Sequence, residues 1–160
     1  MTSNQLPERV YVASSWRNDM QPAVVQTLRA AGIDCYDFKH PAPDNEGFHW
    51  SDVMPAYTRV GPGSPEQLAH VNEYVAALQH PITVDGFDRD FDAMWDCDAC
   101  VLVLPCGRSA HLELGWFVGQ HKRTAILLDG PMVTPELMYK MVDYVATNMM
   151  DLLGWLGVQD

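Results

Sequence analysis

The sequence lacks any apolar stretch long enough to cross a membrane. A spanning helix needs ~20 consecutive apolar residues, and runs such as Ala99 to Leu104 are far shorter. Nothing in the chain resembles a signal peptide either. Cysteine is also scarce, with 4 among 160 residues, and each lies in or beside an expected strand or helix. We therefore expect a reduced protein of the cytoplasm with no membrane partner.

Basic residues are few. The chain has 10 Lys and Arg against 21 Asp and Glu, and its net charge is -11. Such a balance leaves no positive surface for duplex nucleic acid or for anionic lipid. Nucleic acid is therefore excluded as a partner, and an anionic ligand depends on locally placed arginines.

Cofactor and metal motifs are missing too. The sequence contains no G-x-G-x-x-G and no P-loop, and Cys97 and Cys100 form a C-x-x-C pair without a second ligand pair. Two core thiols explain that pair better than a metal does. We expect no cofactor and no bound metal.

The apolar patterns that are present alternate between strands and helices. A chain of 160 residues is expected to form one domain, residues 1–160. The alternation predicts an α/β fold with an open parallel sheet of four to five strands, helices on both faces and a flavodoxin-like or Rossmann-like order. The expected strands are Arg9–Ala13, Ile33–Phe38, Ala99–Leu104 and Thr124–Leu128.

The remaining segments give weaker signals. Apolar spacing predicts a helix with its buried face at Leu68, Val71, Val75 and Leu78, and a last helical region from Thr134 to Leu156 with a break near Asn148. The long segment Lys39 to Gly63 holds an aromatic cluster at Phe48, His49 and Trp50. These rings could stack on a base or cap the core.

Glu113 is the most conspicuous carboxylate. The stretch from Asp96 to Gly119 passes from a buried strand through a turn into a helix, which Ser109 is expected to cap. Glu113 then falls in the first turns of that helix, where the dipole favours an ionised carboxylate. It could be a nucleophile or base, or it could only complement the dipole.

Topology brings two turns together. If the strands beginning at Arg9 and Ala99 are neighbours, the switch point of the sheet lies between their carboxyl ends. The turns that follow them contain Ser14, Ser15, Trp16 and Arg17 in one case and Gly107, Arg108 and Ser109 in the other. Both sets could surround a phosphate, although either arginine could instead pair with a surface acid.

At these residues the chain resembles the nucleoside 2-deoxyribosyltransferase-like superfamily, which includes transferases and nucleotide N-glycoside hydrolases. The matching pieces are a tyrosine in the first strand, Val10-Tyr11-Val12, the acidic helix before the central strand, and Glu113-Leu114-Gly115. The resemblance implies Glu113 as the nucleophile, Tyr11 as the group that orients it, and Asp90 as the proton relay to the leaving base.

The chain also departs from the transferases. Gly107 stands six positions before Glu113, where they have an acidic base-recognition residue, and Glu136-Leu137-Met138 stands where they have Asn-Leu-Met reaching into a neighbouring subunit. The methionine is present there as Met138, and the amide is not. By contrast, Ser15-Trp16-Arg17 is similar to the Ser-x-Arg turn that monophosphate hydrolases of the superfamily place around the 5′-phosphate, which favours a nucleotide substrate.

Two other functions stay open at this point. Some TIR-like NAD-cleaving domains have a similar sheet and a glutamate on the helix after a strand, and a nucleotide-sensing module could use Glu113 only to hold a ribose hydroxyl. The apolar positions from Leu137 to Leu156 form a wider surface than a helix needs to pack on one face of a sheet. Together with the resemblance, it predicts a homodimer or a higher homo-oligomer.

Overall fold

A computed structural model describes residues 6–54, 65–130 and 134–158. The chain divides into two compact units, the first made of Met1–Asp37 and Ala93–Asp160 and the second of Phe38–Asp92. The single domain expected from the length of the chain stays a prediction.

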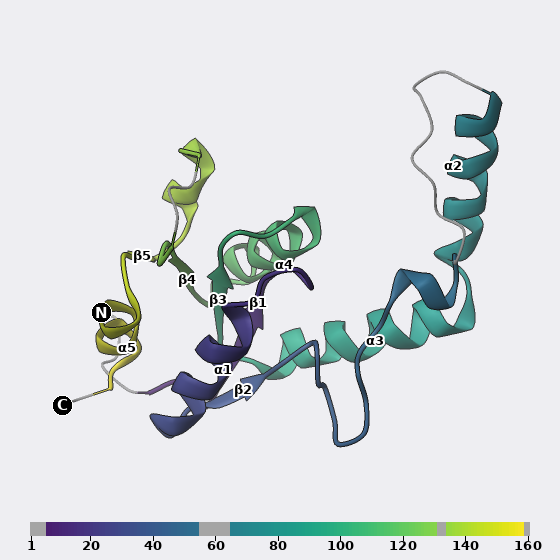
Figure 1. Ribbon diagram of the computed structural model, residues 1–160. Helices are drawn as coiled ribbons and strands as arrows, with labels where there is room; N and C mark the ends of the chain where they lie inside the picture. The colour runs from purple at the N-terminus through teal and green to yellow at the C-terminus, as the bar shows by residue number, and fades with distance from the viewer. Residues whose placement is uncertain (1–5, 55–64, 131–133, 159–160) are drawn as a thin grey trace. The chain divides into compact units, whose positions relative to one another are not determined.

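The first unit is built on a five-stranded parallel sheet (Figure 1), in the order β2-β1-β3-β4-β5. This order confirms the predicted architecture, because β1 and β3 are neighbours with Val10 opposite Ala99 and Val12 opposite Val101. Every residue of β3 is buried, as its unbroken apolar run predicts for a central strand covered on both faces. The strands are β1 Arg9–Ala13, β2 Asp34–Tyr36, β3 Ala99–Val103, β4 Arg123–Leu127 and β5 Tyr144–Ala146.

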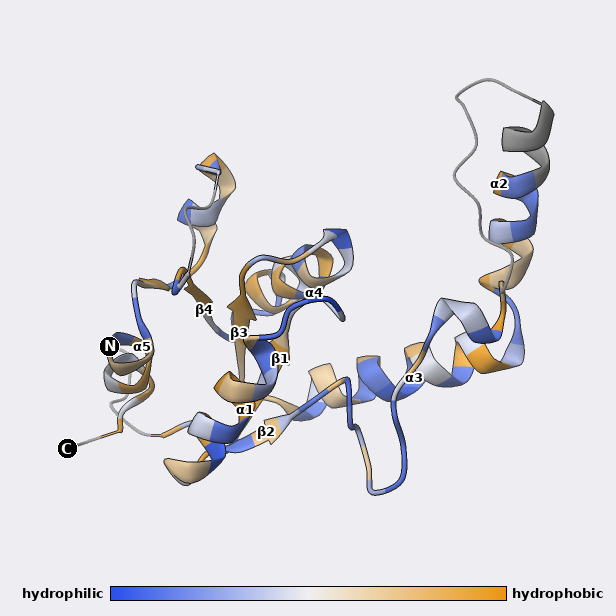
Figure 2. Cartoon of the chain, viewed as in Figure 1, coloured by the Kyte–Doolittle hydropathy of each residue, from blue (hydrophilic) through white to orange (hydrophobic). Residues whose placement is uncertain are grey.

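Helices cover both faces of this sheet. Val10 and Val12 point to a core shared with α1 (Gln21–Ala30) and α5 (Met149–Leu156). The alternate residue Tyr11 points the other way and packs on Phe117 of α4 (Arg108–Gly119). Figure 2 shows β3 and β4 in hydrophobic colours, which agrees with their position inside these two layers.

The C-terminal region differs from the expected helical region. Residues Leu137–Met141 form a 3-10 helix, η2, and β5 follows at Tyr144–Ala146 before α5 begins. The prediction of one helical region was wrong here because β5 pairs with Ala125–Leu127 of β4, and this pairing outweighs helical spacing. The predicted break is confirmed, since the Asn148 side chain accepts a hydrogen bond from the Asp151 amide and caps α5.

The start of α4 also differs from expectation. Gly107 is the N-cap, with extended backbone and no side-chain cap bond, and the helix begins at Arg108. Ser109 therefore lies inside the first turn and does not cap the helix. The backbone becomes helical earlier than the Ser109 signal suggests, which places Glu113 in the second turn.

The second unit contains η1 (Trp50–Asp52), α2 (Pro65–Ala77) and most of α3 (Pro81–Asp96). Phe48 packs so closely on α3 that a Cβ added at Gly86 would lie 2.9 Å from the Phe48 Cβ. The predicted buried face of α2 is wrong for Val71, Val75 and Leu78, which are 48%, 56% and 38% exposed. The side chain of Leu68 and residues 55–63 of the long loop lie outside the described residues.

Among the helices formed by residues 6–54, 65–130 and 134–158, none has the length and apolar character that a membrane crossing requires.

Candidate functional site at the carboxyl ends of β1 and β3

The switch point of the sheet lies between β1 and β3. These strands are hydrogen-bonded neighbours, but the chain leaves β1 toward α1 on one face and leaves β3 toward α4 on the other. Open α/β sheets bind ligands where the connections diverge in this way. The two turns named from the sequence therefore flank one location.

The first turn, Ser14 to Asn18, exposes two of its four predicted site residues. The Asn18 amide donates to the Ser15 carbonyl oxygen at 3.0 Å, which closes a tight turn. Trp16 is 39% exposed, and Arg17 is exposed as well. The Ser15 hydroxyl accepts from the Arg17 amide at 3.2 Å. Trp16 and Arg17 are thus available to a ligand.

Ser14 has a different role within this turn. Its hydroxyl donates to the Val103 carbonyl oxygen at 2.8 Å, which joins the end of β1 to the end of β3. Because its one proton is used in that bond, Ser14 can offer a ligand only its oxygen lone pairs.

The second turn leads from β3 into α4. Gly107, Arg108 and Ser109 are all exposed, and Gly107, as the N-cap, has no side chain that could cap the helix. The amides of a helix N-terminus attract anions, and Arg108 adds a positive charge beside them. This end of α4 therefore suits a phosphate or a carboxylate.

Glu113 lies half-buried on α4. Burial and, after it, the charge of Glu113 together raise the pKa of Cys106 to about 12. Burial and then Glu113 also raise the pKa of the fully buried Cys100. The Glu113 carboxylate is therefore close to β3 and to the turn that follows it.

Tyr11 is fully buried in the layer between the sheet and α4. Its ring stacks on Tyr36 with centroids 5.3 Å apart and packs on Phe117 at 5.7 Å. Tyr11 lies opposite Cys100 in the strand register, and Phe117 is one helical turn beyond Glu113. The structure thus brings Tyr11 into the same layer as the glutamate.

A cavity of about 730 Å³ lies along the other flank of α4. Met138 lines it, and Glu113 does not; its apolar wall includes Leu104, Leu114, Val118, Met141 and Val142. Within it, His111 Nδ1 is 2.8 Å from the Gly107 carbonyl oxygen, and Nε2 is 2.9 Å from the Tyr139 hydroxyl. Since a carbonyl only accepts, Nδ1 of the neutral ring donates to Gly107, and Nε2 accepts a hydrogen bond from the Tyr139 hydroxyl. His111 is thus a packed residue.

Two predicted site residues belong to the second unit. Asp90 is half-buried on α3. Trp50 is 41% exposed in η1, with its ring 5.1 Å from Phe48 and 5.4 Å from Tyr74. Their roles beside Glu113 stay predictions.

Sequence reasoning missed Asn18, which is 4% exposed and bonds to both turns. The available signal was its position: it is a polar residue in a turn that follows a buried strand at the predicted switch point.

No group of three or more His, Cys, Asp or Glu residues is placed to hold a metal within the part of the chain that the structure describes. Cys97 and Cys100 are both buried as thiols, which confirms that the C-x-x-C pair belongs to the core.

No protein-family model matches this chain. A segment of 99 residues, 59% of the chain, is 30% identical to argininosuccinate lyase 1 of Shouchella clausii strain KSM-K16. The chain spans only 18% of the length of that lyase, and the activity of the whole lyase is not transferred to it.

Solved structures give a fuller match. The fold is similar to that of a 2-deoxyribosyltransferase from Bacillus psychrosaccharolyticus, with TM-score 0.53 and 17% identity over 94% of this chain and 97% of that one. It is also similar to a conserved protein from Enterococcus faecalis V583, with TM-score 0.51 and 12% identity over 92% and 96% of the two chains.

A CMP N-glycosidase from Clostridium botulinum matches 92% of this chain and 97% of its own at 17% identity, but its TM-score of 0.47 supports no argument. The other two likenesses, at 17% and 12% identity, show the fold alone. They confirm the fold that the resemblance to the nucleoside 2-deoxyribosyltransferase-like superfamily implies.

Proposed function

We propose that this protein is an enzyme that cleaves the N-glycosidic bond of a nucleotide or nucleoside. The main support is the position of Glu113, half-buried in the second turn of α4 beside the switch point of a sheet whose fold is similar to that of a 2-deoxyribosyltransferase. The residues match the chemistry, because breaking this bond builds positive charge on the sugar and negative charge on the base.

In the proposed reaction the Glu113 carboxylate attacks the anomeric carbon. The carbon-nitrogen bond breaks, and Asp90 supplies the proton that the leaving base needs. Water, or the nitrogen of a second base, then attacks the same carbon and releases Glu113. Tyr11 orients the carboxylate from the layer beneath it.

The substrate that we favour has a 5′-monophosphate. The exposed Arg17 with Ser15, and Arg108 with Ser109 at the uncapped start of α4, offer guanidinium and hydroxyl donors to its oxygens. Trp16 and Trp50 supply aromatic surface for a base or sugar, while Ser14, Gly107 and Met138 complete the set of proposed contacts.

We also propose that the protein is a homodimer or a higher homo-oligomer. Leu137, Met138 and Met141 are 76%, 59% and 49% exposed beside an apolar cavity, and a closed two-fold contact would cover such a surface. Light scattering after size exclusion tests this proposal. A mass of one chain at micromolar concentration, with full activity, would contradict it.

The four cysteines are free thiols, which supports a reducing compartment such as the cytoplasm.

One screen tests the proposed activity. The protein is incubated with ribo- and deoxyribonucleosides, their 5′-monophosphates and NAD, with and without an added acceptor base, and chromatography follows released base and new nucleoside. We expect free base from a monophosphate. Nicotinamide from NAD would indicate a TIR-like enzyme, and binding without any product would indicate a sensing module.

A further inference from the structure

Asn18 forms a dense set of hydrogen bonds at the switch point. It is 4% exposed, and its Nδ2 lies 3.0 Å from the Ser14 Oγ, 3.2 Å from the Val103 carbonyl oxygen and 3.2 Å from the Pro105 carbonyl oxygen. Its Oδ1 accepts from the Met20 amide at 2.9 Å. Asn18 therefore contacts residues near the ends of three elements, β1, β3 and α1.

These bonds connect the two turns that we place around the substrate. The backbone amide of Asn18 closes the tight turn that begins at Ser15, and the Asn18 side-chain oxygen accepts from the Met20 amide, so the backbone around Arg17 is held by the same residue. Val103 is the last residue of β3, and Pro105 is in the segment that leads to Arg108. One side chain thus fixes the backbone on both sides of the switch point.

Few side chains can satisfy this geometry. A carboxamide supplies two donor protons and an acceptor oxygen on a short stem, and here the donors face three oxygens while the acceptor faces an amide. An aspartate has nearly the same shape but would place an acceptor against those three oxygens. The site therefore selects for donor chemistry as well as size.

We infer that Asn18 is a positioning residue that holds the turn with Arg17 and the turn with Arg108 in one fixed arrangement. It does not touch the substrate itself. The inference rests on the proposed function where it concerns catalysis, because a fixed arrangement of the two arginines matters most for a ligand with a phosphate.

The test uses three variants of the full chain. Asn18→Ala removes the two side-chain donor protons and the acceptor oxygen. Asn18→Asp keeps the shape and the bond to the Met20 amide, but it replaces the donor NH2 group with an oxygen that only accepts. Thr124→Val is the matched control. Thr124 is 1% exposed and bonds to Asp143 near the amino end of β4, so its substitution lowers stability far from the switch point.

The first measurement is hydrogen exchange, which does not depend on activity. Both Asn18 variants should raise exchange in segments 13–20 and 103–109 together, by about tenfold, because both segments lose the same side-chain link. Thr124→Val should leave both segments protected. Faster exchange in only one segment, or unchanged exchange in Asn18→Asp, would overturn the inference.

The second measurement is kinetic. Both Asn18 variants should reduce kcat/KM for the monophosphate about tenfold more than for the matching nucleoside. A purely structural loss would lower both values by the same factor, as a smaller folded fraction does, and would overturn the inference. If the wild-type protein releases no base from any substrate, the proposed function fails, and the exchange measurement alone decides the role of Asn18.

Discussion

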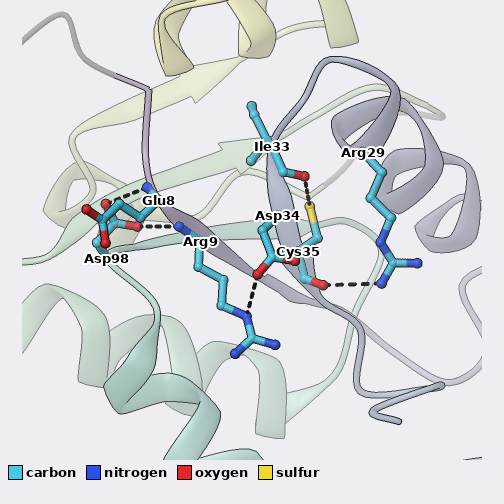
Figure 3. Close-up of polar contacts among 7 residues, drawn as sticks. All are labelled: Glu8, Arg9, Arg29, Ile33, Asp34, Cys35 and Asp98. Atoms are coloured by element: carbon cyan, nitrogen blue, oxygen red, sulfur yellow. Dashed lines mark hydrogen bonds and ion pairs between the residues drawn. The ribbon is translucent and has the colours of Figure 1, made fainter. Parts of the chain in front are cut away.

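The two ends of the parallel sheet use their polar residues differently. At the amino ends of β1, β2 and β3, polar groups bond to other parts of the same sheet (Figure 3). The Asp98 carboxylate accepts from the Glu8 and Arg9 amides at 3.1 and 3.0 Å, and Arg9 pairs with Asp34 at 3.1 Å. This end therefore stabilises the strand order.

Lys122 has the same kind of role beside the amino end of β4. Its Nζ donates to the carbonyl oxygens of Met94, Trp95 and Cys97, at 3.0, 2.6 and 2.6 Å. These carbonyls lie at and just beyond the C-terminal end of α3, where a positive charge is favourable.

The carboxyl ends instead leave several polar groups exposed. Ser14 and Asn18 join β1 to β3, but Arg17, Arg108 and Ser109 are all exposed. The contrast shows that the polar groups at the amino ends stabilise the fold. At the carboxyl ends, hydrogen bonds fix the backbone of the two turns, and the arginine side chains of those turns stay exposed. Variants at the two ends should therefore separate stability from activity.

The largest expected effect at the carboxyl ends comes from Glu113→Gln. Base release should fall by at least about 10³-fold, ~4 kcal/mol of barrier, because the amide keeps the shape but loses the charge and the nucleophile. Steady-state kinetics, with calorimetry to confirm unchanged ligand binding, measure it. Turnover retained within about tenfold, ~1.4 kcal/mol, would remove Glu113 from this role.

Arg17→Ala should have a smaller and more selective effect. Loss of a charge-assisted contact should weaken binding of a monophosphate by about 10- to 100-fold, ~1.4–2.8 kcal/mol, with little change for the matching nucleoside. Titration calorimetry in the Glu113→Gln background avoids turnover.

The control is Arg123→Ala at the amino end of β4, where the guanidinium donates to the Trp155 carbonyl oxygen at 2.9 Å. It should not change the ligand preference. Equal losses for both ligands in Arg17→Ala would show that Arg17 is structural.

Asp98→Ala tests the amino ends. It removes the acceptor of two backbone amides and should lower the free energy of unfolding by about 1–2 kcal/mol, with kcat/KM per folded molecule unchanged. Denaturant titration measures the loss, and the exposed neighbour Asp96→Ala should stay within about 0.5 kcal/mol of wild type. A fall in kcat/KM per folded molecule of Asp98→Ala, as large as that of a variant at the carboxyl ends, would contradict the separation of stability from activity between the two ends of the sheet.

The smallest expected effect concerns the Cys106 thiol. Burial, followed by the charge of Glu113, raises its pKa to about 12. Glu113→Gln removes the second cause, so the pKa falls, the thiolate fraction grows, and alkylation at constant pH should accelerate by about threefold.

Mass spectrometry of peptides labelled with iodoacetamide measures the rate at Cys106. Cys35 and Cys97 are the internal controls, because burial is the first cause of their raised pKa values and Glu113 is not among the others. Glu113→Asp, which keeps the charge, should react like wild type. An unchanged rate in Glu113→Gln would mean that the carboxylate points away from Cys106.

Much of the fold could be predicted from local patterns. The run Ala99 to Leu104 predicted a strand buried on both faces, and β3 has every residue buried. The position of β1 beside β3 was a conditional prediction, taken from the flavodoxin-like order that such an alternation of strands and helices favours, and the register confirms it. The apolar run of β3 depends on close neighbours in the chain, which the sequence displays directly.

Other features depend on contacts between distant residues. Tyr144 to Ala146 fitted a helical pattern but pairs with β4. Val71 and Val75 fitted a buried helix face but are exposed. In both cases the regular spacing of apolar residues predicted a helix face. That spacing does not tell which other part of the chain packs against the face.

For the candidate site, the sequence by itself predicted that the two turns meet at one switch point if β1 and β3 are neighbours, and that Glu113 follows on the next helix. Only the tertiary structure decided how the polar residues there are used. The Ser14 hydroxyl donates to the Val103 carbonyl oxygen, and Asn18 bonds to both turns. Arg17 and Arg108 stay exposed. The physical reason is that a side chain's donors and acceptors are assigned by the oxygens and amides that the folded chain places around it, and these come from residues far away in the sequence.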